Sequence, residues 1–307
     1  MRAIFFDQRG RIRSGWRAAT FLFSFLLLSF FAILSSITFI STFPMGESAT
    51  SFIPLIVPFT ISALIAILLG WLYGKLFEGL PFRALGISFS GGWLKNFAAG
   101  CLIGAVALSS AIVIAMMSGG LNLTANRESS GTAVATTLLT TLLIFAVGAA
   151  SEESLFRGYL LQTFIRPKHF FIGIGLTSLL FAVAHNNNPD ASRLSMLNTF
   201  LAGIWFATAY LKTRDLWFPL GIHLTWNWLQ GPVFGINVSG ITEFSPDPVL
   251  RATDLGPAWL TGGSYGIEGG IACTIALVIS IGLIYFLPGI KPDPELFVLS
   301  ENHKQEI

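Results

Sequence analysis

The chain has 307 residues, of which 53% are hydrophobic and only 11% are charged. Soluble domains carry about 25% charged residues, so this composition excludes an ordinary soluble domain and indicates an integral, multi-pass membrane protein. The formal net charge of +2 is too small to indicate nucleic-acid binding. Cys101 and Cys273 both lie in apolar runs and are predicted to be small buried residues rather than a disulfide framework.

Long apolar runs recur along the whole chain, comparable to the roughly 20 residues that cross a bilayer as a helix. These runs lack the alternation of apolar and polar residues that is typical of strands. Because backbone N–H and C=O groups must form hydrogen bonds inside lipid, the sequence predicts an all-α fold of about eight transmembrane helices. The predicted spans are 17–43, 52–77, 96–117, 133–165, 169–186, 195–212, 216–236 and 267–288. Together they make a single membrane domain over residues 1–307.

The lysine and arginine residues predict which way these spans run. With the N-terminus in the cytoplasm and alternating spans, fifteen of the 18 basic residues fall on the cytoplasmic side, and only Arg127, Arg193 and Arg251 fall on the other. Both termini are therefore predicted to be cytoplasmic, and the polar connection 237–266 is predicted to be a non-cytoplasmic loop. In a prokaryote the membrane would be the plasma (inner) membrane.

The fourth span carries charges where burial is costly. Its stretch GAASEESLFRGYL, residues 148–160, contains Glu152, Glu153 and Arg157. Glu153 and Arg157 are four residues apart on one helix face and are predicted to form an ion pair, while Glu152 points about 100° away from Glu153. The small residues 148–150 are expected to let neighbouring helices approach closely. Glu152 is a functional candidate, and the alternative is a structural ion pair with a spare carboxylate.

Two later spans add polar groups at membrane depth. The fourth and fifth spans form an antiparallel hairpin in which Glu152 and His185 lie at similar height, so the two side chains can meet. His223 and Asn227 are four residues apart on one face of the seventh span. Taken singly, His185 is an ordinary interface residue, and Asn227 is equally well explained by a hydrogen bond between helices. Together, on three spans, these residues indicate a reaction site.

This set of side chains suits hydrolysis of an amide bond. A carboxylate beside a histidine, such as Glu152 with His185, can activate water as a general base. His223 and Asn227 can donate hydrogen bonds to an oxyanion. Alternatively, Glu152, His185 and His223 form a two-histidine, one-glutamate set of the kind that holds catalytic zinc. An HExxH motif is absent from the sequence, and the residues leave metal-bound and metal-free water equally open.

With these motifs, the chain resembles the CAAX protease and bacteriocin-processing (CPBP) family of intramembrane proteases, the type II CAAX prenyl endopeptidase (Rce1-like) or Abi group. The family's EExxxR, FxxxH and HxxxN motifs appear in order at 152–157, 181–185 and 223–227. The resemblance implies that Glu152 is the catalytic glutamate and His185 its partner in activating water. It implies that His223 and Asn227 stabilise the transition state, supported by Glu153 and Arg157. Both metalloprotease and metal-independent glutamate mechanisms are argued for the family.

The leading hypothesis is an intramembrane endopeptidase with a catalytic helical core over 133–236. Its partners would be membrane lipids and a membrane-anchored or lipidated peptide substrate, which reaches Glu152 through a cavity between spans four to seven. One alternative is a non-proteolytic immunity or scaffold protein of the same family. Another is a secondary transporter that uses Glu152 and the histidines as a proton relay, although the paired repeats and broken helices common in transporters are not found in the sequence.

Overall fold

The structure is a computed structural model that describes residues 2–6, 10–42, 47–89 and 92–301. It is 73% helical, and a helix lies in every predicted span. These helices are α2 (Ser14–Ile40), α3 (Glu47–Glu78), α4 (Trp93–Met117), α5 (Gly131–Glu153), α7 (Phe170–Ala184), α8 (Arg193–Thr213), α9 (Trp217–Trp228) and α11 (Ile271–Phe286). Residue 43, the predicted end of the first span, lies outside the described residues. Shorter helices are α1 (Arg2–Phe5), α6 (Gln162–Ile165), α10 (Ala258–Thr261) and α12 (Pro294–Glu301).

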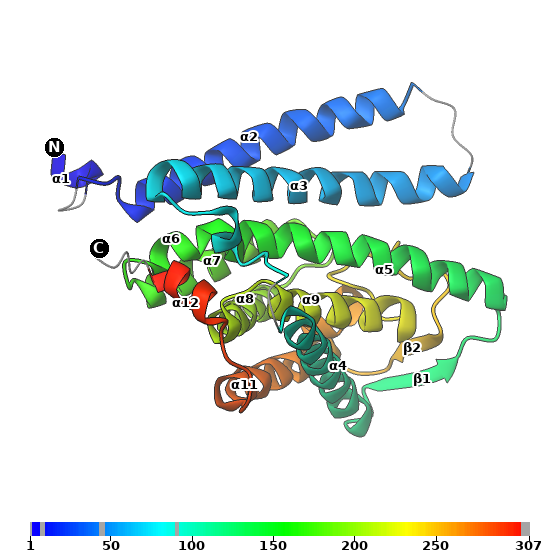
Figure 1. Cartoon of the computed structure of the whole chain (residues 1–307). Coiled ribbons are helices and arrows are strands. Elements are labelled where there is room, and N and C mark those ends of the chain that lie inside the picture. Colours follow the sequence, from blue (N-terminus) through cyan, green and yellow to red (C-terminus); the bar gives the residue numbers. More distant parts are fainter. Residues whose placement is uncertain (1, 7–9, 43–46, 90–91, 302–307) are drawn as a thin grey trace.

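The predicted all-α, multi-pass membrane fold is confirmed. Among the described residues, five helices are long and apolar enough to cross a membrane, namely Ser14–Ile40, Phe52–Glu78, Trp93–Met117, Gly131–Ile165 and Arg193–Thr213. The apolar helices α7 and α11 are shorter, with 15 and 16 residues. The count of eight spans and the cytoplasmic position of the termini stay predictions. Helices α1 and α12 do lie at the same end of the helix bundle (Figure 1).

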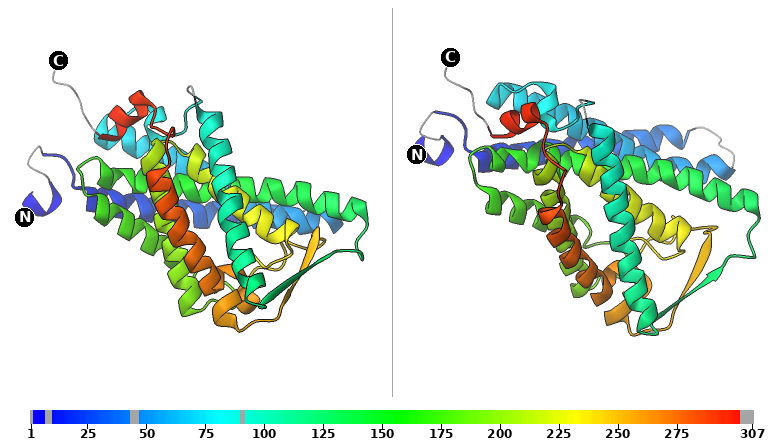
Figure 2. Two further views of the ribbon diagram at one scale, coloured as in Figure 1. Left: turned by 90° about the horizontal axis from the view of Figure 1, so that it is seen from below. Right: turned by 60° about the horizontal axis from the view of Figure 1, so that its bottom comes forward.

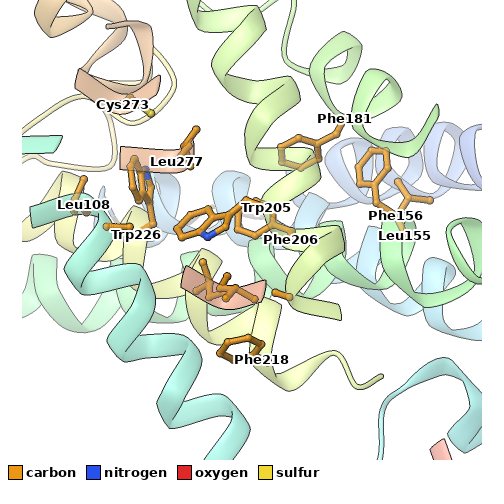
Figure 3. Close-up of a cluster of buried hydrophobic side chains, with 14 of the residues drawn as sticks. Leu108, Leu155, Phe156, Phe181, Trp205, Phe206, Phe218, Trp226, Cys273 and Leu277 are labelled. Carbon is orange, nitrogen blue, oxygen red and sulfur yellow. The ribbon is translucent and has the colours of Figure 1, made fainter. Parts of the chain in front are cut away.

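The long helix α5 separates two groups of helices: α2 and α3 on one side, and α4, α7, α8, α9 and α11 on the other. Helices α2 and α3 run side by side, and α3 packs along α5 (Figure 1). Beyond α5, helix α9 packs against α4, and α8 packs against both α7 and α11 (Figure 2). Aromatic side chains of α7, α8 and α9, among them Phe181, Trp205, Phe206 and Trp226, fill the space between these helices (Figure 3). Cys273 is buried in this cluster as predicted, whereas the prediction is wrong for Cys101 of α4, which is only half-buried; both thiols are free.

Helices α4 and α9 touch through their backbones. A side chain on Gly100 of α4 would collide with the carbonyl oxygen of Phe218, and one on Gly221 of α9 would collide with that of Phe97. Small residues are the usual means by which helices approach this closely in membranes. By contrast, Gly148 faces only the ring of Phe59 at ordinary contact distance. The expectation that the small residues at 148–150 bring helix backbones together is therefore wrong for Gly148, and the close approach lies between α4 and α9.

The predicted loop 237–266 is folded rather than extended. Within it, β2 (Leu250–Asp254) pairs antiparallel with β1 (Leu121–Ala125), so that Leu121 lies opposite Asp254. This small sheet lies at the end of the bundle opposite α1 and α12 (Figure 1). The sequence reasoning missed both strands because each has five residues and the pairing joins segments far apart in the chain.

Candidate active site

The EExxxR motif lies at a change of helix type. The α-helix α5 ends at Glu153, and the chain continues as a π-helical segment from Ser154 to Leu160. The N–H of Leu161 donates to the carbonyl of Phe156 at 3.0 Å, which is the i to i+5 bond of a π-helix. A second π-helical segment, Leu229–Val233, directly follows α9. Such segments are rare and occur frequently at functional sites, and here each directly follows a helix that carries candidate residues.

Arg157 is fully buried, and its charge is compensated on several sides. One guanidinium nitrogen lies 3.1 Å from Oε1 of Glu153, and the other donates to the carbonyl of Gly203 at 3.0 Å. The guanidinium also lies over the rings of Phe181 and Phe206, with its central carbon 4.9 and 5.0 Å from the ring centres. The structure thus contains the pairing of Glu153 with Arg157 that the helical spacing predicts.

Glu153 has a second partner that the sequence did not reveal. Nδ1 of His223 lies 3.0 Å from Oε1 of Glu153 and donates its proton to that carboxylate. This bond fixes the orientation of the ring and leaves Nε2 facing the cavity, where it accepts a hydrogen bond in the neutral ring and donates one in the protonated ring. Phe206 stacks on the imidazole, with ring centres 4.6 Å apart and an interplanar angle of 17°. Glu153 therefore orients His223 as well as neutralising Arg157.

Glu152 faces a cavity, and one of its oxygens has no partner. Oε2 is buried without a hydrogen bond and lies 3.8 Å from Nε2 of His223. This distance is too long for a direct hydrogen bond. A polar gap of this length is one that a water molecule can bridge. The geometry leaves a carboxylate and an imidazole nitrogen facing the same small volume.

His185 is held by its own helix. It ends α7, and its Nδ1 lies 2.8 Å from the carbonyl of Phe181, which sets Nδ1 as the donor and leaves Nε2 free. The expected meeting of Glu152 with His185 across the hairpin is not among the contacts of the described residues. Glu152 instead lies within ion-pair distance of His223, whose ring is held against α5 by its bond to Glu153.

All four candidate residues nevertheless line one cavity of about 520 Å³, namely Glu152, His185, His223 and Asn227. The Asn227 amide makes no hydrogen bond to any residue that the structure describes, so its N–H groups are free to serve a ligand. The cavity walls are mostly apolar. They include Leu26 of α2 and Val183 of α7, whose side chains are exposed on the outer surface of the bundle. The cavity thus reaches the surface that lipid would cover.

The arrangement of side chains does not fit a three-ligand metal site. In the described parts of the chain, no group of three His, Cys, Asp or Glu side chains is placed to hold one ion. The alternative in which Glu152, His185 and His223 bind zinc would require them to move closer together.

Residues 134–229, which contain all three motifs, match the model of the family described as type II CAAX prenyl endopeptidase Rce1-like. The chain is also 33% identical over 90 residues to an uncharacterized 24.3 kDa protein of Escherichia coli. That match covers 28% of this chain and 40% of the Escherichia coli protein, well short of its full length. The resemblance inferred from the motifs is thereby confirmed: residues 134–229 match the Rce1-like family model.

Proposed function

We propose that the chain is an intramembrane endopeptidase in which Glu152 activates water for attack on a peptide bond. The observation that carries this proposal is the unpartnered oxygen of Glu152, buried at a cavity wall 3.8 Å from Nε2 of His223. Unlike the carboxylates of Glu78 and Glu153, the Glu152 carboxylate has no arginine partner among the described residues, so a purely structural role would leave its charge uncompensated. The same carboxylate is well suited to accept a proton from bound water.

The reaction follows from the groups around the gap. Glu152 takes a proton from water, and the resulting hydroxide adds to the carbonyl carbon of the peptide bond. Protonated His223 and the amide of Asn227 donate to the oxyanion that forms. Glu153 stabilises the positive charge on His223 through Nδ1. Glu152 then returns its proton to the leaving amine as the C–N bond breaks, which restores the carboxylate.

His185 has a supporting part in this proposal. Its Nδ1 is bonded to the carbonyl of Phe181, so Nε2 is the atom available to accept a hydrogen bond from water or substrate in the cavity. The family resemblance assigns it to the activation of water beside Glu152.

The substrate is proposed to be a membrane-anchored or lipidated peptide. The exposed residues Leu26 and Val183 at the cavity wall support a lateral route from the lipid, since they lie on the outer surface of α2 and α7. Membrane lipids would therefore border the entrance. A hydrophobic anchor could remain in the lipid while the adjoining peptide segment reaches Glu152.

A comparison of membrane proteomes tests the activity while the substrate is still unidentified. Membranes from cells that express the wild type, Glu152→Ala or the loop control Glu243→Ala are compared for new peptide termini. We expect one set of cleaved termini in the wild type and the control that is absent from Glu152→Ala at equal protein level. Identical termini in all three samples would reject the peptidase and favour a non-proteolytic scaffold.

A further inference from the structure

The cavity contains a second carboxylate that the proposed reaction does not use. Glu268 lies just before α11 and lines the same cavity as Glu152. Its Oε1 accepts from the indole N–H of Trp226 at 3.1 Å. Its Oε2 accepts from the backbone N–H of Ser239 at 2.7 Å and from the Ser239 hydroxyl at 2.9 Å. These bonds fix the carboxylate in place.

The charge of Glu268 is not neutralised by the protein. Within the described residues, no Lys, Arg or His nitrogen lies within the 4.0 Å of an ion pair from this carboxylate. The residues that line the cavity include Glu152 and Glu268 and two histidines, but neither Lys nor Arg. Carboxylates in a cleft with low-dielectric walls concentrate cations and repel anions. The cavity is therefore built for a positively charged group.

The polar part of the cavity lies toward one end of the bundle. Ser239 and Glu268 come from the connections on either side of β2, the strand that lies at the end opposite α1 and α12 (Figure 1). Asn188, which follows α7, belongs to the same part of the cavity, because the backbone of its neighbour Pro189 packs closely against Gly240. The hydroxyl of Tyr265 is also buried there without a hydrogen-bond partner. It lies among the side chains of Asn188, Thr199 and Ser239, all of which line the cavity.

We propose that Glu268 determines specificity by binding a cationic group of the peptide substrate, which enters from the end of the bundle opposite α1 and α12. The group would be a Lys or Arg side chain or a free amino terminus, because each can donate charge-assisted hydrogen bonds to a carboxylate. Under the predicted topology this end faces away from the cytoplasm. The proposal rests on the proposed peptidase function and adds to it the charge of the substrate and its direction of entry.

The charge of the cavity can be measured without catalysis. The reporter variant is Asn188→Cys. It is made in a chain whose own cysteines, Cys101 and Cys273, have been replaced by alanine. A matched control reporter is placed at the exposed Asn122 of β1. Each is reacted with membrane-impermeant methanethiosulfonates, one cationic (trimethylammonium-ethyl) and one anionic (sulfonatoethyl), applied to right-side-out vesicles.

We expect the ratio of cationic to anionic reaction rates to be at least roughly tenfold higher at position 188 than at 122. Glu268→Gln should lower that excess by about threefold or more, because one of two cavity carboxylates is neutralised. The exposed control Glu243→Gln should leave it unchanged. Equal ratios at positions 188 and 122, or an excess that survives Glu268→Gln, would overturn the cationic subsite. Labelling of position 188 only after the vesicles are opened would overturn the direction of entry.

Glu268 also holds the loop at Ser239, so a loop displacement must be separated from a loss of charge. Ser239→Ala removes the hydroxyl bond and keeps the carboxylate, and Glu268→Asp keeps the charge on a shorter side chain. Both should retain the preference for the cationic reagent. Its loss in both variants would assign Glu268 to loop structure alone. Labelling needs no cleavage, so the two proposals can fail separately. If position 188 prefers the cationic reagent but Glu152→Ala leaves the peptide termini unchanged, the peptidase is rejected and the cation-binding cavity remains.

Discussion

Two clusters of buried charge, one around Glu78 and one around Glu152, differ in whether their carboxylates have arginine partners. Near α1 and α12, Arg17 and Arg166 lie 2.7 and 2.6 Å from the two oxygens of Glu78, and all three side chains are buried. Around the cavity, Glu152 retains one buried oxygen without a hydrogen bond, 3.8 Å from His223. The first cluster ties α2, α3 and the end of α6 together and involves both carboxylate oxygens. The second leaves a reactive atom facing an open volume.

This difference separates a structural role from a chemical one more clearly than burial does. An ion pair between buried groups is weak support for stability by itself, but removal of one partner leaves an unpaired charge. Glu78 is thus expected to matter for folding and not for cleavage. Glu152 is expected to matter for cleavage and little for folding. Glu153 belongs to both categories, since it neutralises Arg157 and orients His223.

After changes at Glu152 itself, His223→Ala should give the largest effect on the cluster around the cavity. It removes the proposed oxyanion donor and one partner of Glu153, so cleavage of a peptide identified by the proteome comparison should slow by about 10²–10⁴-fold. The matched control is His169→Ala, which alters an exposed histidine at the other end of α7. A rate equal to that of the control would remove His223 from the mechanism.

Glu78→Ala tests the closed cluster. Loss of the carboxylate leaves Arg17 and Arg166 buried without their common partner, and the free energy of unfolding should fall by about 3–5 kcal/mol. Thermal unfolding in detergent micelles measures the change. The fraction that remains folded should cleave at the wild-type rate. Unchanged stability would show that the arginines find other partners, and the proposed structural role would then fail.

Asn227→Ala should produce a smaller loss of rate with no loss of stability. The side-chain amide makes no hydrogen bond to any described residue, so its removal breaks no hydrogen bond between the helices. Removal of one oxyanion donor typically slows a reaction by about 10²–10³-fold. Rate and melting temperature are measured on the same preparation. A lower melting temperature with an unchanged rate would assign Asn227 to helix packing instead.

Arg83→Ala should have the smallest effect. Arg83 pairs with Glu295 of α12, but about half of each side chain is exposed to solvent. Exposed ion pairs contribute less than about 1 kcal/mol. A larger loss of stability on thermal unfolding would mean that docking of α12 matters more than the pair's exposure suggests.

Local sequence rules were sufficient for the helices and for one contact of the site. Apolar length located the eight helical segments, and the spacing of Glu153 and Arg157 was enough to predict their pairing because both lie on adjacent turns of one helix. The bond between Glu153 and His223 was beyond such rules, since its partners are 70 residues apart and meet only after α5 and α9 pack.

Other features were visible in the sequence but not interpretable. Gly100 and Gly104 have the four-residue spacing typical of a close helix contact. The sequence around them does not predict that α9 is the helix they contact. Glu268 lies at the edge of the predicted span 267–288, where its sequence position does not distinguish it from an ordinary charged residue flanking a transmembrane helix. Only the folded connection that brings Ser239 to its carboxylate, with Trp226 on its other side, places it in the cavity wall. Tertiary packing decides both cases.

The central claim is that Glu152 performs chemistry rather than supports the fold. The most direct measurement is the cleavage rate of Glu152→Gln per mole of folded protein, taken together with its melting temperature. The account predicts a rate at least about 100-fold below wild type at an unchanged melting temperature. A rate within about twofold of wild type would contradict it, because a glutamine side chain cannot act as the general base.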